Sequence, residues 1–264
     1  MIDRIPAALT IAGSDPSGGA GIQADLKTFH QFGVYGEAVI TLLTVQNTVV
    51  VERVECLKAD LVEQQIRAVV RDIPPRAAKT GALGNGAIIE TIARLAEEFT
   101  FPLIVDPVMI GKHGAALLGL EACDLLRTRL IPCAYLLTPN LPEAAALTGT
   151  DVTNLAEMRE AAKALAGLGA RNVLVKGGHL TAEATDVLLH DGTWFEFPAP
   201  RIPSRHTHGT GCTYSAAITA GIATGHDLPS AVAGAKKFIQ EAIRTAPGLG
   251  HGCGPVNHFA SPSQ

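Results

Sequence analysis

Short apolar runs alternate with longer segments of helical periodicity along this chain, and that alternation limits the possible folds more than any other feature. The runs are rich in β-branched residues and show little polar alternation, which is typical of strands buried on both faces of a sheet. The predicted strands cover residues 7–12, 39–45, 103–105, 135–137 and 173–175.

Helical segments lie between these runs. Asp60 and Glu63 have the spacing of a capping box, which predicts a helix that extends to about Arg71. Residues 157–168 are rich in alanine and leucine and end before a glycine, and residues 212–223 form a second alanine-rich segment. The alternation predicts an α/β fold, in which a mostly parallel central sheet lies between two layers of helices.

Residues 186–197 depart from this alternation. Two short strand-like runs flank Asp191 and Gly192, a dipeptide that favours the tight turn of a β-hairpin. We expect this hairpin to be an antiparallel addition at the edge of the sheet. No linker, repeat or shift in composition divides the chain, so residues 1–264 are predicted to form a single domain.

Charge and composition exclude several classes of protein. The formal net charge is −4, whereas proteins that bind nucleic acid normally carry an excess of positive charge. The apolar run at residues 5–12 is too short for a membrane span or a signal peptide. The five cysteines form no CxxC pair, so neither a disulfide framework nor a zinc site is indicated. We expect a soluble cytoplasmic protein that acts on a small molecule and has no nucleic-acid or membrane partner.

Polar or glycine-rich turns follow most of the predicted strands. In an open α/β sheet, ligands bind beyond the carboxyl ends of the strands. The turns lie at residues 13–15, 46–47, 79–81, 106–107, 138–140 and 176–178. We therefore expect them to converge on one crevice.

The first turn leads into residues 18–24, which contain the pattern GxGxxA at residues 19–24. A dinucleotide-binding fingerprint requires its glycines directly after the first strand and an acidic residue near the end of the next one. We reject it because residues 14–17 separate Gly13 from the later glycines, and because Glu37 precedes the second strand instead of following it. The remaining interpretations are a flexible entry into a helix and a loop that covers the substrate, with Asp25 in the helix behind it. No Walker A sequence is present.

The strongest local signal is the turn of Gly209, Thr210, Gly211 and Cys212, which stands immediately before an alanine-rich helix. Glycines let successive amide N–H groups turn toward one point, and the start of a helix adds the positive end of its dipole. The pattern predicts an anion site that suits a transferred phosphoryl group. A glycine-rich turn that simply closes a loop is the alternative.

Cys212 is a candidate proton acceptor. The field at the start of the helix should lower the pKa of its thiol and make the thiolate accessible near neutral pH. A buried, inert thiol is the alternative. A cysteine hydrolase is disfavoured because no third residue can be named to orient His206 or His208, so these histidines are expected to be loop residues or neighbours of a phosphate.

Oxygen-bearing side chains follow two other predicted strands. Asp106 closes one strand, and Asn140 and Glu143 follow the next. Carboxylates at neighbouring strand ends can hold a hydrated Mg²⁺ ion beside nucleotide phosphates. Each residue by itself is also a common turn or helix-cap residue.

Lys176 follows the last buried strand and is placed to reach phosphates across the crevice, while Gly177 and Gly178 leave room for a nucleotide. A solvated charge is the alternative for Lys176. We expect Lys236 and Lys237, in the last helix, to be solvated charges.

Seven segments of the chain closely resemble the motifs of bacterial hydroxymethylpyrimidine/phosphomethylpyrimidine kinases, and they occur in the same order along the sequence. The longest is LTIAGSDPSGGAGIQADLK at residues 9–27. The match runs essentially from residue 7 to residue 258, and motifs in the family's order are more specific than any one alone. The further segments are residues 45–48, 78–81, 105–109, 138–144, 175–179 and 208–213.

The resemblance implies a ribokinase-like, three-layer α/β/α fold and the use of ATP and Mg²⁺. It implies two successive phosphorylations in thiamine biosynthesis, of 4-amino-5-hydroxymethyl-2-methylpyrimidine to its monophosphate and then to the diphosphate. It also implies a homodimer.

The resemblance assigns roles residue by residue. Gln46 would hydrogen-bond the aminopyrimidine, and the other substrate-binding residues would be Gly13, Asp25, Ala82 and Val108. The nucleotide contacts would be Asn140, Lys176, Gly178, Thr210 and Gly211, the metal ligands Asp106 and Glu143, and the catalytic residues Cys212, Gly209, Thr210, Gly211 and Lys176.

Three positions depart from the family pattern. Ala82 stands where many members have methionine, which would widen the pyrimidine pocket. Residues 113–115, His-Gly-Ala, replace a commoner Ser-Gly-Asp, and Asn257 replaces a frequent histidine.

These residues predict in-line attack of the hydroxymethyl oxygen on the γ-phosphoryl group of ATP. Cys212 would accept the proton while the amides of residues 209–212 hold the developing charge. A pyridoxal or pyridoxine kinase is the alternative enzyme. A catalytically silent nucleotide-binding regulator is the alternative from another class, and it is disfavoured because Cys212 and Lys176 are both present.

Overall fold

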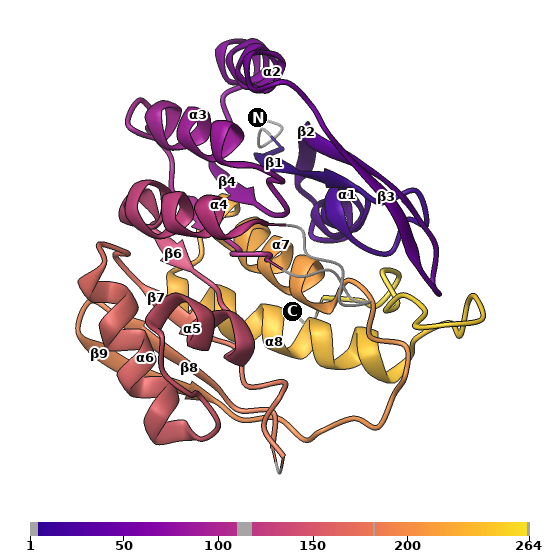
Figure 1. Cartoon of the computed structure of the whole chain (residues 1–264). Coiled ribbons are helices and arrows are strands. Elements are labelled where there is room, and N and C mark those ends of the chain that lie inside the picture. Colours follow the sequence, from indigo (N-terminus) through magenta and orange to yellow (C-terminus); the bar gives the residue numbers. More distant parts are fainter. Residues whose placement is uncertain (1–4, 110–117, 182, 263–264) are drawn as a thin grey trace.

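One nine-stranded sheet forms the centre of the protein (Figure 1). The structure is a computed structural model that describes residues 5–109, 118–181 and 183–262, so residues 113–115 lie outside the described ranges. The strands are β1 Ala7–Ser14, β2 Tyr35–Gln46, β3 Val51–Cys56, β4 Ala77–Thr80, β5 Leu103–Val105, β6 Leu136–Leu137, β7 Val173–Val175, β8 Asp186–His190 and β9 Thr193–Phe197. Their order in the sheet is β3-β2-β1-β4-β5-β6-β7-β8-β9.

The sheet is parallel from β2 through β7 and antiparallel at its two edges. The chain goes from β1 to β2 and β3 on one side of the sheet, and it then returns to β4 on the other side of β1. This reversal creates a crevice at the carboxyl ends of the central strands, where α/β proteins bind ligands. The mostly parallel sheet predicted from the sequence is therefore confirmed.

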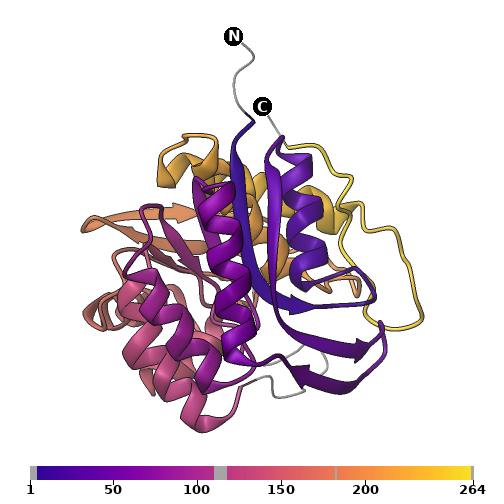
Figure 2. The ribbon, with the colours of Figure 1, turned by 90° about the horizontal axis from the view of Figure 1, so that it is seen from above.

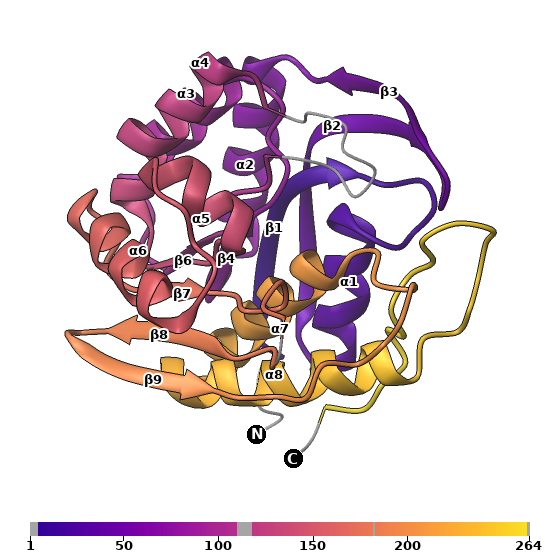
Figure 3. The same cartoon turned by 60° about the horizontal axis from the view of Figure 1, so that its bottom comes forward.

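Helices cover both faces of the sheet, as Figures 2 and 3 show for α1 and α2 on opposite sides of β1 and β2. Helices α1, α7 and α8 pack on one apolar cluster, and helices α2 to α6 pack on the other. The bounds are α1 Gly21–Gln31, α2 Ala59–Asp72, α3 Gly86–Ala96, α4 Leu120–Leu125, α5 Leu141–Thr148, α6 Leu155–Gly167, α7 Thr210–Ala223 and α8 Leu228–Arg244. A π-helical turn, Leu126–Leu130, and a 3₁₀ turn, Ile131–Cys133, follow α4.

The edge hairpin is present where the sequence predicts it. Strands β8 and β9 pair antiparallel beside β7. Asp191 and Gly192 connect them with φ angles of 44° and 79°, the left-handed conformation that a two-residue hairpin turn requires.

The capping box expected at the start of α2 is wrong. Lys58 is the residue before the helix, and it provides no side-chain cap. The carboxylate of Asp60 accepts a hydrogen bond from the next amide, and Glu63 pairs with Arg67 and Arg94. Glu63, which the spacing assigns to the capping box, therefore forms ion pairs with two arginines instead of bonding the backbone at the start of the helix.

Strand β4 is absent from the sequence-based assignment because a charged residue interrupts its apolar pattern. Lys79 lies within this strand and is fully buried. Its ammonium is 2.7 Å from the carboxylate of Asp25 in α1, and Thr10 of β1 donates a hydrogen bond to the same oxygen. A buried charge becomes tolerable when it is paired in this way.

Lys236 of α8 also differs from its expectation as a solvated residue. Its ammonium lies 2.7 Å from Asp186 at the start of β8 and donates to the carbonyl of Ala184. Tyr214 of α7 donates to the same Asp186 oxygen. Both charges of this ion pair are buried, and the pair joins α8 to the edge hairpin.

Within the described ranges, no helix is long and apolar enough to cross a membrane.

We expect Lys236→Met to lower the free energy of unfolding by about 3 kcal/mol, since removing one partner of a buried ion pair leaves the other charge uncompensated. Lys237→Met is the matched control, because Lys237 is exposed on the same helix, and it should change the stability little. Urea denaturation of the three proteins measures both effects. Equal stabilities of the two variants would contradict the buried pair.

Candidate active site

Side chains from the ends of three neighbouring strands meet at the head of α7. Lys176, which follows β7, places its ammonium 2.8 Å from Oδ1 of Asp106, which follows β5. Thr138, which follows β6, donates to the same oxygen at 3.2 Å. A Cβ atom on Gly211 would lie 3.5 Å from the Lys176 nitrogen and 3.9 Å from Oδ2 of Asp106. The structure thus brings these predicted site residues together beside the glycine turn.

Gly209 turns the chain into α7 in close contact with the loop that follows β1. Its φ angle is 76°, and a Cβ atom here would lie 1.7 Å from the carbonyl oxygen of Gly19. The amide and hydroxyl groups of Thr210 both face the carbonyl of Thr207, at 3.3 and 2.8 Å. The first-turn amides of Gly211 and Cys212 have no partner inside a helix and are the donors placed for an anion.

The thiol of Cys212 is half-buried at this helix start. Burial raises its pKa, which reaches about 12 although Lys79 acts in the opposite direction; Asp25 and Asp106 raise it further. The amide of Gly21 donates a hydrogen bond to the sulfur. The expectation of a lowered pKa is therefore wrong for this structure, because the loss of hydration outweighs the favourable field.

Asp25 occupies a position behind the surface of the crevice. Its side chain is fully buried, pairs with Lys79 and lies within electrostatic range of Cys212. Its Oδ1 atom is buried without a hydrogen-bond partner among the described residues. The Lys79–Asp25 pair is thus an unexposed pair of charges next to the candidate catalytic thiol.

Asp15 is the functional residue that sequence reasoning missed. Its carboxylate accepts hydrogen bonds from the amides of Ser17, Gly19 and Ala20, and it lies 2.8 Å from Nε2 of His208. Burial alone would raise the pKa of Asp15, but the bonds from its partners hold that pKa well below its usual value. Asp15 thereby ties the loop after β1 to the residue just before Gly209. The polar turn after β1 was a signal for a site, but it did not reveal this partner.

Gly13 of β1 and Ala82, which follows β4, are neighbours among the candidate substrate residues. A Cβ atom on Gly13 would lie 2.6 Å from Cδ1 of Leu42 and 3.6 Å from Cβ of Ala82, so the backbone at Gly13 leaves little space. The side chain of Gln46, at the end of β2, lies beside the carboxylate of Asp15 and acts to lower the pKa of that carboxyl. Val108 remains close to Asp106, because its amide donates to the Asp106 carbonyl.

Asn140 and Glu143 form the capping box of α5. The Glu143 amide donates to Oδ1 of Asn140 at 2.9 Å, and the Asn140 amide donates to Oε2 of Glu143 at 2.8 Å. Burial, together with the charge of Asp106, raises the pKa of Glu143 to about 7 against the opposing effect of Lys176. Asn140 and Glu143 therefore do cap the helix, as the alternative interpretation of each residue predicts. The cap also holds Glu143 close enough to Lys176 and Asp106 for their charges to act on it.

The two glycines after Lys176 have different surroundings. A Cβ atom on Gly177 would lie 1.8 Å from the carbonyl oxygen of Thr185, and the Gly177 amide donates to Asp186. A Cβ atom on Gly178 would have no described atom within 4 Å. The room that the sequence predicts for a nucleotide at both glycines is therefore present at Gly178 only, because the carbonyl of Thr185 occupies the space beside Gly177.

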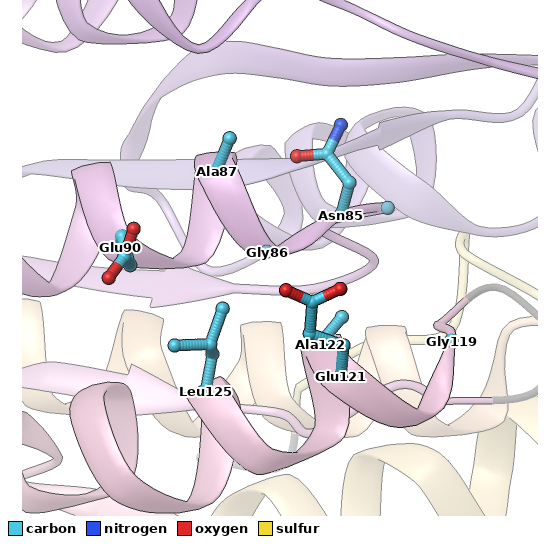
Figure 4. A pocket seen from close by; sticks show the side chains of 9 residues that line it. Asn85, Gly86, Ala87, Glu90, Gly119, Glu121, Ala122 and Leu125 are labelled. Carbon is cyan, nitrogen blue, oxygen red and sulfur yellow. The ribbon is translucent and has the colours of Figure 1, made fainter.

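A cavity of about 520 Å³ lies apart from these residues, between α3 and α4 (Figure 4). Glu90 and Glu121 line it, together with Asn85 and Leu125. The two carboxylates would repel the phosphates of a nucleotide. This cavity is therefore no candidate for the phosphoryl-transfer site.

Comparisons with known proteins agree with the arrangement of this site. Residues 15–257 match the family model described as phosphomethylpyrimidine kinase. A hydroxymethylpyrimidine/phosphomethylpyrimidine kinase of Bacillus subtilis is 47% identical over 256 residues, covering 96% of this chain and 94% of that protein.

Solved structures show the same similarity. The crystal structure of a phosphomethylpyrimidine kinase from Clostridium difficile has a TM-score of 0.81 and 45% identity, and the match covers 90% of this chain and 99% of that one. An ADP complex of a Bacillus subtilis pyridoxal kinase has a TM-score of 0.89 and 39% identity, with coverage of 97% and 98%.

We expect Gly209→Ala to reduce phosphoryl transfer by about 100-fold, because the added carbon must push the turn away from Gly19 and misplace the amides behind it. Gly234→Ala is the matched control, since a Cβ atom there would meet nothing within 4 Å among the described residues. Steady-state kinetics measure the loss, and thermal melts show whether each variant is folded. A fully active Gly209→Ala enzyme would contradict the importance of this contact.

Proposed function

The chain belongs to the phosphomethylpyrimidine kinase family, and we propose that it phosphorylates 4-amino-5-hydroxymethyl-2-methylpyrimidine and then the resulting monophosphate, with ATP as donor, in thiamine biosynthesis. Relatives named for both activities match it along nearly their whole length. The observation that carries the proposal is the Lys176–Asp106 pair, held 2.8 Å apart beside Gly211 at the start of α7. A fixed cation and free helix amides at one point are what phosphoryl transfer requires.

In the proposed first reaction, the hydroxymethyl oxygen attacks the γ-phosphoryl group in line, and the bond from the γ-phosphorus to the bridging oxygen breaks to release ADP. The amides of Gly211 and Cys212 donate to the phosphoryl oxygens, and the Lys176 ammonium offsets their charge. Asp106 holds Lys176 in place through the 2.8 Å contact. The chain therefore contributes mainly position and electrostatic stabilisation, the dominant factors in this class of reaction.

The residues around Lys176 also fit Mg²⁺. Asp106, Glu143 and Thr138 supply the oxygen atoms that this ion prefers, and Mg²⁺ retains water ligands beside them. The raised pKa of Glu143, to about 7, reflects its burial and the nearby Asp106 charge, a repulsion that a divalent cation would relieve. When bound, Mg²⁺ would neutralise charge on the nucleotide phosphates.

Cys212 is the proposed acceptor of the substrate's hydroxyl proton. A thiol whose pKa is about 12 carries its own proton at neutral pH, so only its small thiolate fraction is a base. Lys79 favours that thiolate, since its charge acts to lower the pKa. In the second reaction the nucleophile is an oxygen of a phosphate group that is already ionised, which needs little base.

We expect Cys212→Ala to slow the first phosphorylation much more than the second. With the wild-type enzyme, kcat/KM of the first reaction should rise about tenfold per pH unit above neutrality, because the thiolate fraction grows in that proportion below the pKa of about 12. The variant should lose this rise. Cys133→Ala is the control, as Cys133 lies in the 3₁₀ turn after α4. Equal losses in both reactions would remove Cys212 from the base role.

Pyridoxal or pyridoxine phosphorylation is a second candidate function. A specific observation favours it, since the pyridoxal kinase of Bacillus subtilis matches 97% of this chain with a TM-score of 0.89. Ala82 beside Gly13 gives the pocket more space than the methionine common in the resembling family would.

A substrate panel separates the two functions. We expect turnover with hydroxymethylpyrimidine and its monophosphate, each with ATP and Mg²⁺, to exceed turnover with pyridoxal, pyridoxine and ribose. Product formation followed by chromatography measures each rate. Preference for pyridoxal would establish the second candidate, and tight ATP binding with no turnover of any compound would indicate a nucleotide-binding regulator.

We further propose that residues 1–264 act as a single kinase domain in the cytoplasm and assemble as a homodimer. One continuous sheet through the described residues supports the single domain, and the free cysteines suit a reducing compartment. Exposed apolar side chains on the β2–β3 ribbon support the dimer, namely Leu43, Val45, Val49 and Val50.

A further inference from the structure

Glu37 is a buried carboxyl group that the proposed reaction does not use. It lies near the start of β2 and is 6% exposed. Both of its carboxylate oxygens are buried without a hydrogen-bond partner among the described residues. Because burying such a group without a partner is costly, it is expected to serve some purpose.

A cavity of about 400 Å³ adjoins this carboxyl group. It lies between the first half of β2 and the end of α2, two elements that run side by side in Figures 1 and 2. Gln46, the candidate substrate contact, is at the opposite end of the same strand. The cavity is therefore separate from the candidate active site.

The edge of β2 supplies further polar groups to this cavity. On the side away from β1, the strand pairing of β2 begins only at Leu42. Before that point, the side chain of Gln65 bonds both backbone groups of Ile40, at 3.1 and 3.2 Å. Alternate residues of a strand present their backbone groups to the same side. Gly36 and Ala38, which line the cavity, therefore present their backbone groups on the same unpaired edge of β2 as Ile40.

The other walls of the cavity combine negative charge with apolar surface. Asp72 at the end of α2 adds a second carboxylate, and Tyr35 and Ile73 add exposed apolar side chains. Carboxylates beside apolar walls suit an organic cation with an apolar body better than a strongly hydrated metal ion.

We propose that this cavity binds a small organic cation, a primary ammonium group on a short apolar body. Its charge pairs with Glu37, and its N–H groups donate to the carbonyls of Gly36 and Ala38. The apolar body lies against Tyr35 and Ile73.

The state of Glu37 makes the interaction dependent on pH. Burial, and after it the charge of Asp72, raises the pKa of Glu37 to about 7. The cross-strand partner of Glu37 on β1 is Leu9, which carries no charge. A cation should therefore bind more tightly above neutral pH, where Glu37 is ionised, and binding near pH 7 should release a proton.

Calorimetric titration of the whole protein with benzylammonium chloride tests the proposal. At about pH 8 we expect binding to the wild type and to Glu90→Gln, and a loss of about tenfold or more in Glu37→Gln, the equivalent of one charge pair. Glu90 is the matched control because it lines the separate cavity between α3 and α4. Benzyl alcohol, which has the same ring without the charge, should not bind.

Two further measurements keep the test independent of the variant's folding. Wild-type titrations in buffers of different ionisation enthalpy report the released proton directly, and kinase assays show whether Glu37→Gln remains active, as we expect. The proposal is overturned by absent binding at millimolar benzylammonium, by equal affinity of the wild type and Glu37→Gln, by equal binding of benzyl alcohol, or by preferential binding of Mg²⁺.

Discussion

The candidate site depends on the contact between two backbone loops, the loop after β1 and the turn into α7. Gly19 and Gly209 approach so closely that neither position has space for a side chain against the other loop. Asp15 holds this contact together, because its carboxylate collects the amides of its own loop and also binds His208. The candidate substrate residues near Gly13 and the amides of α7 that we propose to bind the phosphoryl group owe their relative positions to this arrangement.

Buried ion pairs form the second element of the site. Lys176 pairs with Asp106 at the ligand side of the sheet, and Lys79 pairs with Asp25 behind it. Such pairs rarely add much to stability, because the lost hydration of two charges offsets their attraction. Their value here lies in fixed charge, since each lysine lies within electrostatic range of Cys212. The thiol is protonated in this environment, so charge on neighbouring groups controls how readily it loses its proton.

The sequence predicts the fold well because apolar periodicity and turn residues are local signals. The buried strands other than β4, the helix that begins near Cys212 and the hairpin at Asp191 and Gly192 follow from such signals. It also indicates which strand ends carry Asp106 and Lys176, since the order of elements brings those ends together. It gives no means of finding the pairing of Asp15 with His208, whose residues lie far apart along the chain. Nor does it show the burial that raises the pKa of Cys212, because dehydration depends on the packed structure.

The bond between Asp15 and His208 has a consequence for how proteins of this design diversify. The groups expected to recognise the acceptor lie mainly in the first third of the chain, on β1, β2 and the turn after β4, whereas Lys176 and the α7 amides come later. A lineage could exchange the early segment and acquire a new acceptor while it keeps the later machinery. The exchange would succeed only if the incoming segment carried an acid at position 15 and glycine at position 19. Recombination between distant relatives would therefore yield an active enzyme only where the contact between Asp15 and His208 is kept.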